Sequence, residues 1–300
     1  MSRQAWAKTA TLYGGLLWGT FWVPVRELDK AGIGGLWPVT LLYTMTWVVI
    51  LPAMLWRWRY IQKGFWKQQV AGFFLGVAAA IYATAFLYTE VATAVLLYYL
   101  SPVWGFILAR VVLGDPITPV RWFAMVLAIG GAAVILGDGD WPPVPGNIGD
   151  WLALSASVLF VTGSLMMLAW KEHSALDYGL AFFLWSGLTM LAATLILDGG
   201  VLDRGLPPLD SLLAEMNWLL PFVLLGMIPG CLAAIYGATV LNPGVVSIIF
   251  MSEIGVAVFL AAMLTDEPFG LRQIVGIVLI ALAGVIESLL DWRRRRVAAA

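Results

Sequence analysis

Ten long apolar stretches account for most of this 300-residue chain, and they constrain its fold more than any other feature. A helix crosses the hydrocarbon core of a bilayer with about 20 such residues. The stretches are continuous rather than alternating in polarity, which favours helices over the strands of a membrane barrel. We therefore predict an all-α integral membrane protein with ten transmembrane helices, at 8–27, 36–56, 69–89, 92–112, 120–137, 150–170, 178–197, 217–240, 244–264 and 271–290.

The composition agrees with a chain whose outer surface faces lipid. Hydrophobic residues make up 61% of the chain and charged residues 12%, with a mean hydropathy of +0.90. A soluble domain carries about twice that share of charged residues. The basic and then apolar N-terminus lacks a cleavage site of the A-x-A type and precedes many further spans, so we predict a retained helix rather than a signal peptide.

The distribution of lysine and arginine predicts the orientation. With both termini in the cytoplasm, thirteen of these residues lie inside and four outside, which follows the positive-inside rule. The outer four are Arg26, Lys30, Arg204 and Arg272. We predict a multi-pass protein of the bacterial inner (plasma) membrane. Residues 292–300 form a basic cytoplasmic tail, which anchors the topology; binding to anionic lipid is the alternative role.

Two stretches of the chain align without gaps, one from Leu100 and the other from Met251. In this alignment Ser101 matches Ser252 and Asp115 matches Asp266. Five spans in each half is an odd number, so the halves insert upside-down relative to each other. We predict two inverted five-helix repeats, at 1–140 and 150–291, joined by a linker loop at 141–149. Such repeats are typical of secondary transporters, whose binding site lies near the middle of the membrane.

The motifs of both halves resemble the ten-helix EamA-type permeases of the drug/metabolite transporter superfamily. They are GGLLWGTFWVPV, ATAVLLYYLSPVWGFILARVVLGDPIT, NPGVVSIIFMSEIGVAVFLAAMLTDEPFG and QIVGIVLIALAGVI. Members typically have a proline-valine pair, here Pro102 and Val103, and then a helix that ends in a Leu-Gly-Glu turn. The second half departs from this pattern, because Glu253 stands in place of the proline and Leu-Thr-Asp at 264–266 in place of the turn. The resemblance implies alternating access around a central cavity without ATP.

Glu253 lies near the middle of the ninth predicted span. An acidic side chain at the centre of a bilayer costs about 2.5–3.5 kcal/mol on insertion scales, so such residues face the bundle interior and mark functional sites. Three roles follow for Glu253. It binds a cationic group of a substrate, it takes up and releases a proton during transport, or it hydrogen-bonds a neighbouring helix and is purely structural.

Aromatic and small polar residues in other spans are candidates to share a substrate site with Glu253. Cation–π attraction makes a carboxylate among aromatic rings suitable for an amine, and the same rings stack on flat solutes. Packing against lipid or at the membrane interface is the alternative role, most of all for Trp22. We predict Pro102, Pro243 and Gly244 as helix breaks or hinges. The predicted substrate-binding residues are Glu253, Trp18, Trp22, Trp47, Tyr82, Tyr98, Tyr99, Ser101, Trp104 and Ser252.

Other function classes lack the residues that they need. The only histidine is His173 in a short loop, and the G-x-G-D pattern at 137–140 precedes a proline-rich turn without a partner aspartate motif. There is no Walker motif, no set of zinc ligands and no basic face for nucleic acid. We predict no enzyme, cofactor or metal, and partners limited to a small-molecule substrate and lipids, in a monomer or homodimer.

The predicted function is secondary active transport of a small organic metabolite: an amine, an amino acid or an aromatic or heterocyclic solute. Proton coupling and exchange are both open at this point, with Glu253 as the candidate proton carrier. The alternatives are an intramembrane enzyme, a structural membrane protein that does not transport, and a channel.

Overall fold

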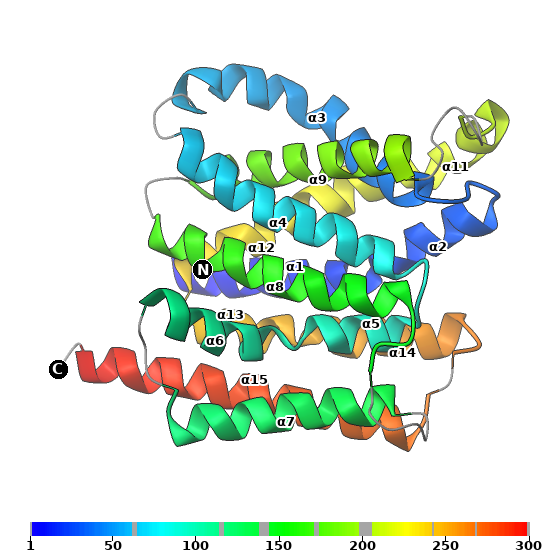
Figure 1. The fold of residues 1–300 in the computed structure, drawn as a ribbon. Helices are drawn as coiled ribbons and strands as arrows, with labels where there is room; N and C mark the ends of the chain where they lie inside the picture. Colours follow the sequence, from blue (N-terminus) through cyan, green and yellow to red (C-terminus); the bar gives the residue numbers. More distant parts are fainter. Residues whose placement is uncertain are drawn as a thin grey trace.

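The computed structural model describes residues 2–61, 65–113, 117–137, 144–170, 174–197, 206–241, 243–267 and 269–298. Within these ranges all regular structure is helical, as predicted, and the helices lie side by side in one bundle (Figure 1). The first half forms α1 (Arg3–Thr20), α2 (Trp22–Lys30), α3 (Trp37–Ile61), α4 (Phe65–Ala85), α5 (Val91–Tyr98), α6 (Ser101–Leu113) and α7 (Pro119–Leu136).

The second half forms α8 (Ile148–Ala169), α9 (Ala175–Leu197), α11 (Leu209–Pro221), the π-helix η1 (Phe222–Met227), α12 (Ile228–Val240), α13 (Pro243–Phe250), α14 (Ser252–Leu264) and α15 (Leu271–Ala298). Helix α8 begins inside the predicted linker 141–149, and α15 carries the helical backbone through the predicted basic tail as far as Ala298. Helix α1 begins and α15 ends at the same end of the bundle (Figure 1).

Seven segments of the described chain are long and apolar enough to cross a membrane. Two shorter apolar helical segments, Ile248–Leu264 and Leu271–Ile286, match the ninth and tenth predicted spans. The first predicted span, 8–27, falls on the separate helices α1 and α2. Large apolar side chains such as Val48 (79% exposed) and Leu197 (77%) lie on the outside of the bundle, where a soluble protein carries charge. The chain is thus an all-helical integral membrane protein.

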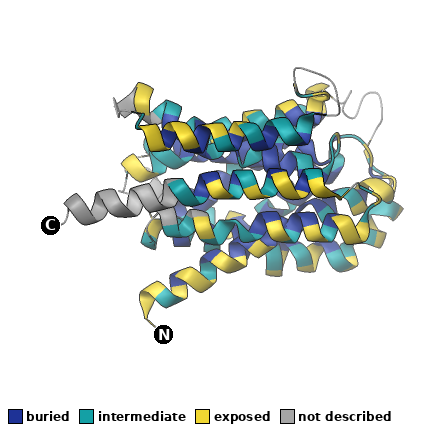
Figure 2. Cartoon of the chain, turned by 90° about the horizontal axis from the view of Figure 1, so that it is seen from below, coloured by how far each residue is buried: buried dark blue, intermediate teal, exposed yellow. Residues whose placement is uncertain are grey.

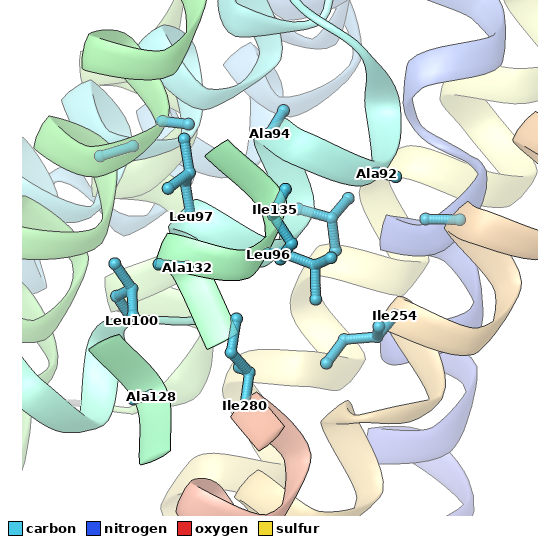
Figure 3. Close-up of a cluster of buried hydrophobic side chains, with 14 of the residues drawn as sticks. Ala92, Ala94, Leu96, Leu97, Leu100, Ala128, Ala132, Ile135, Ile254 and Ile280 are labelled. Atoms are coloured by element: carbon cyan, nitrogen blue, oxygen red, sulfur yellow. The ribbon is translucent and has the colours of Figure 1, made fainter. Parts of the chain in front are cut away.

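Buried residues lie between the helices, and exposed residues lie along their outward sides (Figure 2). The buried side chains form two clusters. The first joins α4, α5, α7, α14 and α15, and Figure 3 shows part of it, with Leu96 of α5 near Ile254 and Ile280. The second joins α2, α3, α4, α9 and η1 around Phe21, Tyr43 and Phe183.

Three of the predicted spans are interrupted in the structure. The first breaks at Phe21, between α1 and α2; the fourth breaks at 99–100, between α5 and α6; the ninth breaks at Met251, between α13 and α14. Pro102 lies in the first turn of α6, where a residue without an N–H group is tolerated. The break at Phe21 is likewise followed by a proline, Pro24, in the first turn of α2. Helix α14, after the break at Met251, contains no proline.

The predicted hinge at 243–244 lies at a helix start. Helix α12 ends at Val240 and α13 begins at Pro243, a position where the fixed φ angle of proline suits the first helical turn. Asn242 and the side chains of Pro243 and Gly244 lie outside the described part of the chain.

Glycines allow close packing between the halves. A Cβ atom added at Gly14 of α1 would lie 2.9 Å from the Cβ atom of Ala234 in α12. A Cβ atom added at Gly19 would lie 2.8 Å from the carbonyl oxygen of Glu253 in α14. Small residues of this kind let membrane helices approach backbone to backbone. Helix α1 therefore packs closely on α12 and α14, while α4 packs on α8 and α9, and α7 on α15.

Candidate functional site

Glu253 lies in the first turn of α14, directly after the break in the ninth predicted span. It is 2% exposed, so its carboxyl group faces the bundle interior, the orientation expected from the sequence. The Tyr82 hydroxyl of α4 lies 3.0 Å from its Oε1 atom, and the Tyr99 hydroxyl lies 2.9 Å from its Oε2 atom. Side chains from the first half thus hold a carboxyl group of the second half.

The Tyr99 hydroxyl has a second neighbour across the two halves. It lies 2.7 Å from the carbonyl oxygen of Phe250, the last residue of α13. The last carbonyls of a helix have no intrahelical partner. Tyr99, which lies at the break between α5 and α6, therefore joins that break to the one between α13 and α14.

Tyr98 completes an aromatic group beside the carboxyl. Its ring stacks on that of Tyr82, with 4.1 Å between centroids and 17° between planes. The rings of Tyr98 and Tyr99 meet edge to face at 6.0 Å. Phe86 and Phe160 extend the group at 4.9 Å from Tyr82 and 5.5 Å from Tyr98, respectively. A carboxyl group bounded by stacked rings is chemically suited to an organic cation or a flat aromatic solute.

Two glycines of α1 position Glu253. A Cβ atom added at Gly15 would lie 2.6 Å from the Ser252 hydroxyl, and one at Gly19 would lie 2.8 Å from the Glu253 carbonyl oxygen. The start of α14 therefore rests directly on the backbone of α1. From this contact the Glu253 side chain extends to the hydroxyls of Tyr82 in α4 and Tyr99 at the break after α5.

Four further predicted residues lie near the breaks or in the first cluster. Trp22 is 2% exposed and belongs to the same cluster as Tyr82. Ser101 and Trp104 are half-buried in the first turn of α6, and Ser252 opens α14. The indole nitrogens of Trp22 and Trp104 and the Ser252 hydroxyl are buried without a hydrogen-bond partner among the described residues. Unpartnered buried donors of this kind are free to bind a solute or water.

The structure places Trp18 and Trp47 against the second cluster, whereas the tyrosines around Glu253 belong to or pack on the first. The Trp18 ring packs on Phe21 at 5.1 Å and on Phe182 at 6.3 Å, in the second cluster. The indole nitrogen of Trp47 donates to the carbonyl oxygen of Phe183 at 2.9 Å, between α3 and α9. Spacing along a helix predicts which side chains share a face, but it does not predict which helix that face meets.

An ion pair at one end of the bundle was not predicted from the sequence. The Arg26 guanidinium of α2 lies 2.5 Å from Glu267 Oε1, and it also donates to the carbonyl oxygens of Phe86 and Thr89. The other oxygen of Glu267 accepts from the backbone N–H of Val91 at 2.8 Å. The signal in the sequence is an arginine and a glutamate at the ends of two apolar spans, which alone does not pair them.

A second ion pair joins α3 to α9. Arg57 Nε lies 2.7 Å from Asp177 Oδ1, and the other oxygen of Asp177 accepts from the Ser174 hydroxyl at 2.7 Å. Gln68 of α4 donates to the Asp177 carbonyl oxygen at 2.6 Å. This cluster fixes the start of α9.

A surface groove of about 540 Å³ lies between α2, α11, η1 and the end of α14. Its lining is largely apolar, with Trp218, Phe222 and Leu260 among its residues, and Glu253 is not part of it. Within the described ranges, no three His, Cys, Asp or Glu side chains lie close enough to share a metal ion.

Residues 5–137 match the model of the EamA-like transporter family. This match supports membership of the drug/metabolite transporter superfamily. The match confirms the predicted family, and it shows that this EamA-like chain is a membrane protein of transporter type. The curated proteins contain no match.

The fold of the EamA-like chain is similar to a solved structure described only as "Crystal structure of protein". The alignment covers 97% of this chain and 99% of the other, with a TM-score of 0.59 and 18% identity. At this identity the similarity shows the fold alone.

Proposed function

We propose that this EamA-like protein is a secondary active transporter of a small organic metabolite in the bacterial inner membrane. It works by alternating access between two inverted five-helix repeats, with ten transmembrane helices and both termini in the cytoplasm. Glu253 and the tyrosines around it bind the substrate near the middle of the membrane.

The pattern of helix packing supports the repeat. The third predicted span packs on the sixth as α4 on α8, and the eighth packs on the first as α12 on α1. In the predicted repeat the third span corresponds to the eighth and the sixth to the first, so these two contacts are equivalent. The fifth and tenth spans, α7 and α15, pack on each other, as two equivalent helices do around an axis. The start of α1 and the end of α15 lie at the same end of the bundle, which supports an even number of crossings (Figure 1).

Glu253 carries the proposal. An ionisable side chain at membrane depth is unfavourable unless it is paired or solvated, and such residues mark substrate and ion pathways. Glu253 makes no ion pair with any described residue, and its partners are tyrosine hydroxyls from the other half. Broken helices in corresponding positions of the two halves are the usual setting of a transporter binding site. Here Tyr99 lies at one of these breaks, and its hydroxyl lies 2.7 Å from the carbonyl oxygen of Phe250, directly before the other.

The chemistry of the site favours a substrate with an amine or an aromatic ring. Attraction between a cation and an aromatic face is worth about 2 kcal/mol when both are removed from water. Tyr82, Tyr98 and Tyr99 supply such faces, and Glu253 supplies the negative charge. An amino acid or a heterocyclic solute meets the same set of groups.

A ligand screen followed by transport tests the proposal. Purified protein is heated with tyramine, choline, tyrosine, adenosine and thiamine in turn, since a compound that binds the folded state raises the melting temperature. The compound with the largest shift is radiolabelled, and its counterflow into proteoliposomes is measured. We expect saturable counterflow in the wild type, none in Glu253→Gln, and wild-type counterflow in Asp29→Asn, which removes an exposed carboxylate at the end of α2.

The same assay separates the other functions. Conversion of the labelled compound into a new product would identify an enzyme, and non-saturable flux without counterflow would identify a channel. Normal counterflow in Glu253→Gln at every pH would mean that the residue has only a structural role. The aspartates of the G-x-G-D pattern and His173 lie outside the described residues.

A further inference from the structure

The hydroxyl of Tyr99 lies within hydrogen-bond distance of two oxygen atoms. Its distances are 2.9 Å to Glu253 Oε2 and 2.7 Å to the Phe250 carbonyl oxygen. The Tyr82 hydroxyl adds a third contact, 3.0 Å from Glu253 Oε1. Three oxygen–oxygen contacts of this length each need one hydrogen atom between the two oxygens.

The hydrogen atoms can be counted. Each tyrosine hydroxyl carries one, a backbone carbonyl carries none, and an ionised carboxylate carries none. With Glu253 ionised, two hydrogens serve three contacts, and one contact of Tyr99 is left as two oxygens facing each other. With a proton on Oε2, Glu253 donates to Tyr99, Tyr99 donates to Phe250, and Tyr82 donates to Oε1. Only the neutral acid satisfies all three contacts.

In the part of the chain that the structure describes, no charged side chain pairs with Glu253 to supply the missing hydrogen. The titratable side chains that face Glu253 are Tyr82 from α4, Tyr98 from α5 and Tyr99 from the break after α5. Helix α1 presents Gly15 and Gly19 to this part of α14. Among the described residues Glu253 makes no ion pair, and an ionised carboxylate buried in this way is strongly unfavourable.

We propose that Glu253 carries a proton in this conformation, and that Tyr99 is the positioning residue that transmits loss of the proton to the break between α13 and α14. When the proton leaves, both oxygens of Glu253 become acceptors. Tyr99 then turns its single hydrogen from the Phe250 carbonyl to Glu253. The carbonyl at the end of α13 loses its donor, which is unfavourable for a buried group. The inference rests on the proposed function and names the proton as its coupling ion.

The contact between Tyr99 and Phe250 joins matching positions of the two halves. Leu100 aligns with Met251, so Tyr99 and Phe250 occupy matching positions, each directly before its break. The hydrogen bond between them therefore joins the two broken spans at equivalent points. The Tyr99 hydroxyl is therefore placed to respond to movement of either half.

Infrared difference spectroscopy of the full-length protein in nanodiscs, titrated from pH 5 to pH 10, tests the proposal. We expect a carboxylic acid band at the acidic end, which disappears as the pH rises and is absent from Glu253→Gln. A backbone carbonyl band is expected to change over the same pH range. Because the carbonyl belongs to Phe250, that band should move in protein labelled with carbon-13 at the carbonyl carbon of phenylalanine.

Two matched variants isolate Tyr99. Tyr82→Phe and Tyr99→Phe each remove one hydroxyl beside Glu253, but only Tyr99 also contacts Phe250. We expect the phenylalanine carbonyl change to persist in Tyr82→Phe and to be lost in Tyr99→Phe. The proposal is overturned if Tyr99→Phe keeps that change, or if wild-type protein shows no carboxylic acid band assigned to Glu253 at any pH. The wild-type spectra show whether Glu253 is protonated even if Tyr99→Phe fails to fold.

The spectra test this inference and the transport assay tests the proposed function, so either one can be contradicted without the other. Counterflow without a protonated Glu253 would leave the proposed function standing and remove this inference. A protonated Glu253 without counterflow of any screened compound would leave the hydrogen-bond switch standing and remove the proposed function.

Discussion

Replacing Gly19 with alanine tests whether the backbone contact between α1 and α14 positions Glu253. The added Cβ atom would lie 2.8 Å from the carbonyl oxygen of Glu253 and 2.8 Å from the Cβ atom of Val256. Neither is the far end of a flexible side chain that turns away easily. The two helices must therefore move apart.

The size of the movement follows from ordinary contact distances. Carbon atoms in contact prefer about 3.5–4.0 Å, so α1 and α14 separate by roughly 0.7–1.2 Å. Overpacking of a close contact costs about 1–3 kcal/mol of folding free energy. The bonds to Glu253 from Tyr82 and Tyr99 measure 3.0 and 2.9 Å, and a movement of this size along them takes both beyond hydrogen-bond length.

The assay is reversible unfolding in mixed micelles, with Gly255→Ala as the matched control. Gly255 lies in the same helix α14, and a Cβ atom there meets nothing within 4 Å. We expect Gly19→Ala to lower the free energy of unfolding by about 1–3 kcal/mol. Gly255→Ala should leave it unchanged or raise it by up to about 1 kcal/mol, because alanine is the better helix former. Equal stability of the two variants would refute the reasoning.

Two further predictions separate structural residues from the site. Arg26→Gln removes the ion pair with Glu267, whose two side chains are 22% and 13% exposed, and should lower the free energy of unfolding by about 1.5–3 kcal/mol, measured in the same micelles; an unchanged value would mean that the pair contributes nothing. Trp47→Phe loses the bond to the Phe183 carbonyl, so we expect a loss of about 0.5–1.5 kcal/mol. Its ligand-induced melting shift should equal that of the wild type, and a shift abolished as in Glu253→Gln would return Trp47 to the binding site.

The sequence predicted features that depend on single residues or on one helix at a time. Hydropathy predicted helices that span a membrane, and the unfavourable energy of a carboxylate in lipid predicted that Glu253 faces inward. Pro102 predicted a break in the fourth span, because proline lacks the N–H group that a helix interior needs. The number of spans, their orientation and the inverted repeat stay predictions.

Features that depend on the packing of several helices could not be predicted from the sequence. The partners of Glu253 come from α4 and from the break after α5, and no spacing within one helix identifies them. Trp18 and Trp47 were predicted to lie with Glu253 because both are aromatic residues within predicted spans, but the packing of α1 and α3 turns them towards α9. The break at Met251 has no proline of its own, so its position was not visible.

The central claim is that Glu253 lies in a pocket reached in turn from each side of the membrane. The chain has one cysteine, Cys231, which is buried in α12. In a Cys231→Ser background, Glu253→Cys is exposed to a membrane-impermeant maleimide in right-side-out and in inverted vesicles. The account predicts labelling from both sides. Labelling from one side only, or from neither, would contradict it.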